Sequence, residues 1–315
     1  MRLVRRSLIR KLVLLLAPMA AFFVSSPVPA QKQDASRHVT FEHNDGHLKR
    51  RLEIRGDVEF NEEYTDIKDI SAGGFVRIEE VLDGQSRRYE VRGYRDKKLI
   101  RMFYLNREMR EIDDAARAWV AQLVLDAVRQ GALDADKRVQ MIVSRRGVTG
   151  VLEEIELIIN DYARGRYYEK LIKYGNLNPA ALEQTLAHAA KHIRSDYEQS
   201  KFLIRVVPTL SGKDTAVPAF FQAVNSIDSD YEHRRVLSAL LKTKKLSEVA
   251  LTQLLNSASA ISSDYEKATL LLEASSTYSG EARLRSAFLR AVETIKSDYE
   301  RGRVLSALLK NKQIG

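Results

Sequence analysis

The chain of 315 residues contains no cysteine. This excludes disulfides, thiolate metal sites, a cysteine nucleophile and an N-terminal lipid-modified cysteine. A Gly-x-Ser-x-Gly nucleophile elbow and a phosphate-binding loop are also missing, because Gly73-Gly74 has neither the spacing nor the strand-to-helix context of such a loop. We therefore expect a protein that is not an enzyme, has no cofactor and is held together by packing alone.

The apolar stretch near the N-terminus is shorter than a membrane-spanning helix. This stretch, residues 12–24, has thirteen residues, whereas a spanning helix needs about 20. A basic head precedes this stretch and Val28-Pro29-Ala30 follows it, which is typical of a Sec-type signal peptide cleaved after Ala30. We expect a periplasmic or secreted protein without stable membrane insertion after cleavage, and an uncleaved anchor is the alternative.

The charge balance gives little support for nucleic-acid binding. Residues 1–30 carry five basic and no acidic residues, so their removal lowers the formal net charge from +9 to about +4. A charge of this size is ordinary for a protein surface, and we expect no nucleic-acid partner. With 44% hydrophobic residues, the remaining chain can bury a core, and its length suits about two domains.

The first half of the mature chain indicates β structure. Residues 31–50 are polar and are expected to be a flexible start. Residues 51–131 change to a period of two, with Asp83-Gly84 as a hairpin turn, and predict a small antiparallel β domain. A helix capped by Asp113 or Asp114 follows and extends to about Arg129. The face expected to cover the sheet consists of Trp119, Val120, Leu123 and Ala127.

The second half, residues 132–315, is expected to be a helical-repeat solenoid. Asp-Tyr recurs at spacings of 35, 34, 34 and 34 residues, and Arg-Val-Leu-Ser-Ala-Leu-Leu-Lys occurs at both 235–242 and 303–310. Self-similarity at this period predicts about five paired-helix repeats, which we expect to be HEAT-like. The predicted fold class is thus α+β, mainly α. The recurring aspartates are Asp161, Asp196, Asp230, Asp264 and Asp298.

Four of the five copies read Ser-Asp-Tyr-Glu, which predicts a capping box at the start of a helix. In a capping box the serine oxygen accepts from the N3 amide and the glutamate reaches back to the serine amide. An isoleucine three residues before each aspartate is expected to end the first helix of the pair and to join the core. The capping pairs are Ser195 and Glu198, Ser229 and Glu232, Ser263 and Glu266, and Ser297 and Glu300.

Residues 56–61 (Gly-Asp-Val-Glu-Phe-Asn), residues 67–74 and the Ile-x-Ser-Asp-Tyr-Glu repeats resemble a family of exported bacterial proteins of undetermined role. The resemblance covers most of the mature chain. Similar regions form the extracytoplasmic tail of some membrane metallopeptidases of the antibiotic-sensor type, which implies a sensing or partner-binding role. The peptidase motif His-Glu-x-x-His is absent here, so no peptidase activity is implied. Relatives tend to have a glycine where this chain has Asn106-Arg107, which leaves that turn type open.

Two groups of residues are candidate sites. His188 and His192 stand four apart on a predicted helix, a spacing that can bind a metal, but no third ligand is evident and ordinary surface residues are favoured. A basic ladder recurs at one repeat position, with Thr269 interrupting it, and each preceding glutamate offers a local ion pair as the simpler explanation. The tyrosines of the repeats are expected to pack between repeats, with the hydroxyl group at the rim. The ladder consists of Arg166, Lys201, Arg235 and Arg303.

The sequence therefore favours a non-catalytic envelope protein, either a protein- or peptide-binding scaffold or a sensory module. Its expected partner is another envelope protein, a peptide or an anionic envelope component. The alternative is an envelope hydrolase or a peptidase-related enzyme with an active site that no motif marks.

Overall fold

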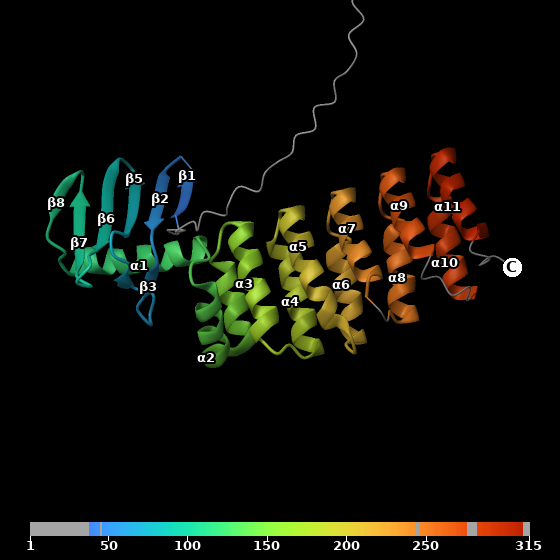
Figure 1. Cartoon of the computed structure of the whole chain (residues 1–315), viewed down its shortest axis with the longest axis horizontal. Helices are drawn as coiled ribbons and strands as arrows, with labels where there is room; N and C mark the ends of the chain where they lie inside the picture. Colours follow the sequence, from blue (N-terminus) through green and yellow to red (C-terminus); the bar gives the residue numbers. More distant parts are fainter. Residues whose placement is uncertain (1–37, 45, 244–245, 276–281, 311–315) are drawn as a thin grey trace, which may run out of the picture. The chain divides into compact units, whose positions relative to one another are not determined.

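The structure is a computed structural model that describes residues 38–44, 46–243, 246–275 and 282–310. The expected signal peptide at residues 1–30 lies outside this range. The fold is α+β and mainly α, with an antiparallel sheet followed by helices (Figure 1). Within the described part, every helix is too short or too polar to cross a membrane.

The main sheet has six strands in the order β1-β2-β5-β6-β7-β8, and every neighbouring pair is antiparallel. Strands β3 and β4 pair separately with each other. The strands are β1 (His38–Asn44), β2 (Leu48–Arg55), β3 (Val58–Phe60), β4 (Ile67–Ile70), β5 (Phe75–Leu82), β6 (Gln85–Gly93), β7 (Leu99–Leu105) and β8 (Glu108–Arg110).

Two tight turns set the register of this sheet. Asp83 and Gly84 have φ angles of 48° and 81°, the left-handed signs of a two-residue hairpin turn, so the predicted β5–β6 hairpin is confirmed. Asn106 and Arg107 also have positive φ angles, 49° and 72°. The Asn106 side chain accepts from the Ser86 amide at 3.0 Å, which helps to hold this turn.

The prediction that residues 31–50 lack regular structure is wrong for residues 38–44 and 48–50. All seven residues of β1 pair with β2, from His38 opposite Arg55 to Asn44 opposite Lys49. β1 is the edge strand of the sheet. Polar residues are common on edge strands, where they discourage pairing with other chains, so the polar composition of this segment concealed its pairing.

Helix α1 (Asp114–Gln130) covers the sheet as predicted. Its N-cap is Asp113, whose side chain accepts from the Ala116 amide at 2.7 Å. Val120, Leu123 and Ala127 share one buried cluster with sheet residues. The single tryptophan, Trp119, is partly buried against this cluster, and its indole nitrogen donates to Glu80 at 3.0 Å. Its expected packing role is confirmed.

The helices that follow form five pairs among the described residues (Figure 1). Gly147, at φ 65° and ψ −163°, interrupts α2 with a conformation that is easy only for glycine. The helices are α2 (Ala135–Glu156), α3 (Asp161–Tyr174), α4 (Pro179–His192), α5 (Asp196–Val206), α6 (Val217–Val224), α7 (Asp230–Leu241), α8 (Glu248–Ala258), α9 (Asp264–Ser275), α10 (Ala282–Glu293) and α11 (Asp298–Lys310), with short 3₁₀ turns at Val207–Leu210 and Asp214–Ala216.

The second helix of each pair begins at the recurring aspartate, and these helices pack in series, α3 on α5, α5 on α7, α7 on α9 and α9 on α11. The first helices pack in a parallel series, α4 on α6, α6 on α8 and α8 on α10. The repeat period therefore corresponds to one helix in each series.

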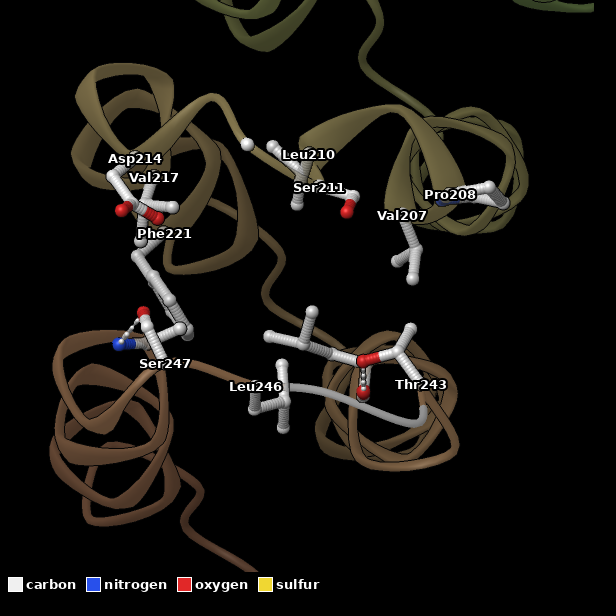
Figure 2. A pocket seen from close by; sticks show the side chains of 13 residues that line it. Val207, Pro208, Leu210, Ser211, Asp214, Val217, Phe221, Thr243, Leu246 and Ser247 are labelled. Atoms are coloured by element: carbon white, nitrogen blue, oxygen red, sulfur yellow. Dashed lines mark hydrogen bonds between the residues drawn. The ribbon is translucent and has the colours of Figure 1, made fainter.

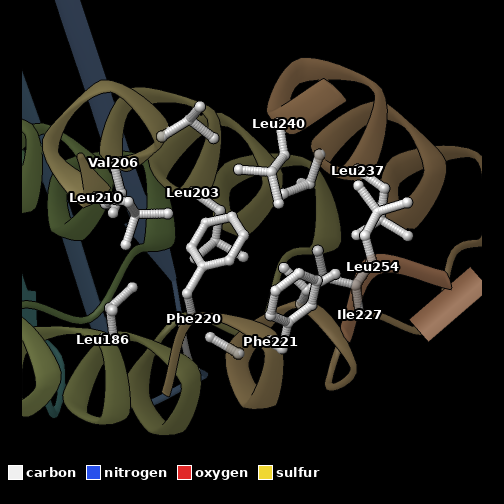
Figure 3. Close-up of a cluster of buried hydrophobic side chains, with 14 of the residues drawn as sticks. Leu186, Leu203, Val206, Leu210, Phe220, Phe221, Ile227, Leu237, Leu240 and Leu254 are labelled. Atoms are coloured by element: carbon white, nitrogen blue, oxygen red, sulfur yellow. The ribbon is translucent and has the colours of Figure 1, made fainter. Parts of the chain in front are cut away.

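One continuous core lies between the two series. Figure 3 shows part of it, where Phe220 and Phe221 of α6 meet Leu203 of α5 and Leu240 of α7. Leu309 of α11 is 65% exposed. Its counterpart Leu241 packs in the core, whereas no described helix follows α11 to cover Leu309. The recurring isoleucines, all buried, are Ile158, Ile193, Ile227, Ile261 and Ile295.

Candidate functional site

The serines of the repeated motif cap their own helices, as predicted. Each serine oxygen accepts from the amide of the glutamate three residues later, at 3.3 to 3.4 Å. These bonds satisfy amide groups that a helix start leaves without partners. The capping serines are Ser195, Ser229, Ser263 and Ser297.

The predicted second half of the capping box is wrong. The serine amide donates to the aspartate one repeat earlier, for example from Ser263 to Asp230 at 2.7 Å and from Ser297 to Asp264 at 2.7 Å. The motif glutamates pair with basic side chains instead, namely Glu198 with Lys201, Glu232 with Arg235, Glu266 with Arg234, and Glu300 with Arg303. In an isolated helix the glutamate would accept from the serine amide. Here the aspartate of the preceding repeat accepts from that amide instead.

A second polar contact joins successive repeats, three residues after four of the five aspartates. Three of these side chains donate to carbonyl groups that lack helical partners at the C-terminal end of the next first helix, and the His233 ring contacts a serine hydroxyl there. The contacts run from Arg164 to the His192 carbonyl (2.6 Å), from Gln199 to the Ala223 carbonyl (2.9 Å), from His233 to the Ser257 hydroxyl (2.8 Å) and from Lys267 to the Thr294 carbonyl (3.1 Å).

The tyrosines of the repeats lie on the surface, so the prediction that they pack between repeats is wrong. They are 53% to 74% exposed, although neighbouring positions of the same helices are fully buried. Position two of the helix points away from the face that meets the first helices. We call these five side chains the tyrosine row: Tyr162, Tyr197, Tyr231, Tyr265 and Tyr299.

Basic side chains of the predicted ladder stand between successive tyrosines. The Lys201 ammonium lies 5.9 Å from the ring centre of Tyr162 and 4.9 Å from that of Tyr197. The Arg235 guanidinium lies 5.9 Å from Tyr197 and 5.8 Å from Tyr231. These distances suit cation–π attraction. Aromatic and basic groups therefore alternate across α3, α5 and α7.

Three of the four ladder residues, Arg166, Lys201 and Arg235, line one pocket of about 350 Å³ beside the tyrosine row, which we call the row pocket. Arg303 lies on α11, outside it. The predicted local ion pairs are present, since Lys201 lies 2.9 Å from Glu198 and Arg235 and Arg303 each contact the glutamate three residues before them. These ion pairs do not neutralise all of the basic side chains that line the pocket.

The row pocket has more cations than carboxylates. Four basic side chains line it against two acidic ones, Glu169 and Glu198, and Glu232, outside the lining, pairs with Arg235. The fourth cation, the exposed Arg205 at the end of α5, was missed from the sequence because it does not recur at the repeat period. Only its place in the fold connects it to the ladder. The surplus charge favours an anionic group, and the tyrosine and lysine stems offer apolar contact around it.

A second pocket, of about 610 Å³, lies between the ends of the α5–α6 and α7–α8 helices and is mostly apolar (Figure 2). Two of its hydroxyl groups already serve the helices. The Thr243 hydroxyl donates to the Leu240 carbonyl at 2.7 Å, and the Ser247 hydroxyl accepts from the Ala250 amide at 3.2 Å. This pocket can receive an apolar side chain, but its hydroxyl groups are not arranged for acid–base chemistry.

The carboxylates whose pKa departs from its ordinary value are in ion pairs or capping contacts. Burial raises the pKa of Glu90 and Glu154, but the two arginines beside each carboxylate lower it by a larger amount. The pKa of both groups is therefore below its ordinary value. A hydrogen bond from a lysine lowers the pKa of Glu59 and of Asp136. A serine amide lowers that of Asp264. Such shifts accompany charge pairing, whereas a general acid needs a raised pKa.

A scan of the chain against models of protein families, a search of curated proteins and a search of solved structures each find no match.

Proposed function

We propose that this chain is a non-catalytic binding protein of the bacterial cell envelope, whose helical half is a HEAT-like solenoid that binds a partner protein or peptide. The two series of packed helices at a period of 34 to 35 residues support the solenoid. Such arrays offer long surfaces on which equivalent positions recur. The envelope location is supported by residues 1–30 of the sequence.

The observation that carries the proposal is the alternation of exposed tyrosines with basic side chains across α3, α5 and α7. Tyrosine and arginine are enriched at protein interfaces, because they combine large apolar contact area with a polar or charged tip. An isolated exposed tyrosine is ordinary, but five at one repeat position form a surface. The explanation expected from the sequence, packing between repeats, does not apply to side chains that are more than half exposed.

The row pocket indicates the chemistry of the partner. Its surplus of cations favours a carboxylate-bearing segment, and neighbouring packed helices stand about 8–10 Å apart. Two such steps separate α3 from α7, which corresponds to about six residues of an extended chain at about 3.3 Å each. We therefore propose an extended acidic segment of a partner protein as the ligand.

The proposal can be tested by photo-crosslinking in living cells. A photoreactive phenylalanine analogue in place of Tyr197 should give a discrete adduct with one envelope protein. The same substitution at Tyr94, an exposed tyrosine that follows β6, serves as the control. Reversal of Lys201 and Arg235 to glutamate should remove the Tyr197 adduct. Adducts from Tyr94 alone would place the binding surface on the β domain and contradict the proposal.

A further inference from the structure

Three side chains of metal-ligand type meet at the surface between α2 and α4. Glu156 ends α2, and His188 and His192 lie one helical turn apart near the end of α4. One ligand atom from each lies within 4.8 Å of the other two. The sequence showed the two histidines but no third ligand, because Glu156 precedes His188 by 32 residues and belongs to the other helix.

The distances come close to those that a bound ion imposes. In a tetrahedral zinc site with bonds of about 2.0–2.2 Å, ligand atoms stand roughly 3.3 Å from each other. The Glu156 carboxylate oxygen lies 3.2 Å from Nε2 of His188 and 3.9 Å from Nε2 of His192. The two imidazole rings are stacked, with centroids 4.2 Å apart and planes at 18°. Binding requires a tilt of the rings toward each other and a small advance of His192.

The ring nitrogens are available for an ion. Nδ1 of His188 is 2.5 Å from the hydroxyl of Tyr168, which leaves its Nε2 directed toward Glu156. Nε2 of His192 is buried and has no hydrogen-bond partner in the structure. A buried nitrogen without a partner is unfavourable, and a ligand at this point would satisfy it. Tyr168 then acts as the group that orients His188, as partners of metal-bound imidazoles commonly do.

The charges that face the cluster act in opposite directions. Arg164 of α3 and Lys191 of α4 act on the cluster and oppose any cation, whereas Glu156 attracts one.

We propose that Glu156, His188 and His192 form a binding site for a divalent transition-metal ion of the zinc type. Two imidazoles and one carboxylate are donors that suit Zn²⁺, and Glu156 is more than half exposed, so the fourth position opens to solvent. A bound ion would clamp the end of α2 to the end of α4. This site is separate from the tyrosine row and does not depend on the function proposed for it.

The test is a calorimetric titration of the tag-free full chain with Zn²⁺ alone. One equivalent should bind, and the thermal midpoint should rise with zinc and return after chelation. Glu156→Gln and His192→Ala should each weaken binding about tenfold or more, and Tyr168→Phe, which leaves all three ligands in place, about tenfold. His47→Ala is the control and should leave the affinity unchanged, since His47 lies outside the cluster.

An X-ray absorption spectrum of the zinc complex should show two imidazole ligands, and the spectrum of His192→Ala should show fewer. Thermal midpoints without zinc will identify any variant that fails to fold, and the exposed position of Glu156 makes Glu156→Gln the least disruptive. Absence of stoichiometric binding by the wild-type chain would overturn the proposal. Unchanged affinity in Glu156→Gln and His192→Ala, or loss in His47→Ala, would do so as well.

Discussion

The recurring aspartate stabilises the repeat that follows it as well as its own helix. The Asp230 carboxylate accepts hydrogen bonds from the backbone amides of Ser262 and Ser263, at 2.8 and 2.7 Å. Asp161 and Asp264 also accept from two amides each in the following repeat, and Asp196 accepts from one. The preference of a helix N-terminus for negative charge would accept glutamate at this position equally. The contact with the next repeat explains why aspartate stands at this position in Asp161, Asp196, Asp230 and Asp264.

Asp230→Ala is therefore expected to lower the free energy of unfolding by about 1–3 kcal/mol, because it removes two hydrogen bonds from backbone amides to a charged group. Asp228→Ala, two residues earlier at an exposed position, is the matched control and should change stability by less than about 0.5 kcal/mol. Urea denaturation of both variants measures the difference. Equal effects would mean that the carboxylate acts only through the helix dipole.

His233 predicts a pH dependence of stability. Burial lowers its pKa from 6.5 to about 4, so the unfolded chain binds the proton at a higher pH than the folded chain does. Stability is then complete above pH 6.5 and is lost as pH falls toward 4. At pH 5 the loss is about 2 kcal/mol relative to neutral pH.

His233→Gln should remove this dependence and keep the inter-repeat contact, because Gln199 occupies the equivalent position and donates to the Ala223 carbonyl. Unfolding free energies of wild type and variant at pH 7.5 and pH 5 provide the check. Parallel losses in the two proteins would assign the acid sensitivity to other groups.

Among the elements, α1 and α2 are joined by a buried ion network. Glu154 of α2 is 4% exposed and accepts from Arg129 of α1 at 2.7 Å and from Arg138 of α2 at 3.0 Å. The Arg138 guanidinium also lies 4.9 Å from the ring of Tyr64, between β3 and β4. The network thus connects the β half with the first helix pair.

Glu154→Gln should destabilise the protein by about 3–5 kcal/mol, since it leaves the buried Arg138 and the partly buried Arg129 without this countercharge. The adjacent Glu153→Gln removes an exposed partner of Arg146 and is expected to cost about 0–1 kcal/mol. Thermal midpoints compare the two. A similar small effect of both substitutions would show that water reaches the network.

The order of helices and strands could be predicted from the sequence where turn and capping motifs agree with the repeat period of 34 to 35 residues. The hairpin at Asp83-Gly84, the cap at Asp113 and the helix starts at the recurring aspartates all carry short-range signals, and the structure has each of them. The edge strand β1 and the third metal-type ligand Glu156 could not be predicted. Both depend on contacts with residues distant in sequence, which no local pattern encodes.

The candidate surface was predictable only in part for a similar reason. The period identified which residues share a position, and so found Arg166, Lys201 and Arg235 before the structure joined them in the row pocket. It did not tell which side of the helix faces solvent at the tyrosine. A tyrosine suits both a packed and an exposed position, so its exposure depends on how the helices stack.

For the whole molecule, residues at the same repeat position are expected to differ in function, because the helices around them differ. Arg235 and Arg303 each pair with the glutamate three residues before them, but only Arg235 lines the row pocket. Arg235→Glu should weaken binding of a polyglutamate peptide roughly tenfold, about 1.4 kcal/mol, whereas Arg303→Glu should not. Fluorescence anisotropy at two salt concentrations measures both affinities, and salt should weaken the wild-type complex by screening. Because both variants lose the same kind of surface pair, their thermal midpoints should shift alike. Equal affinities of the two variants for the peptide would mean that repeat position, and not the pocket, governs binding.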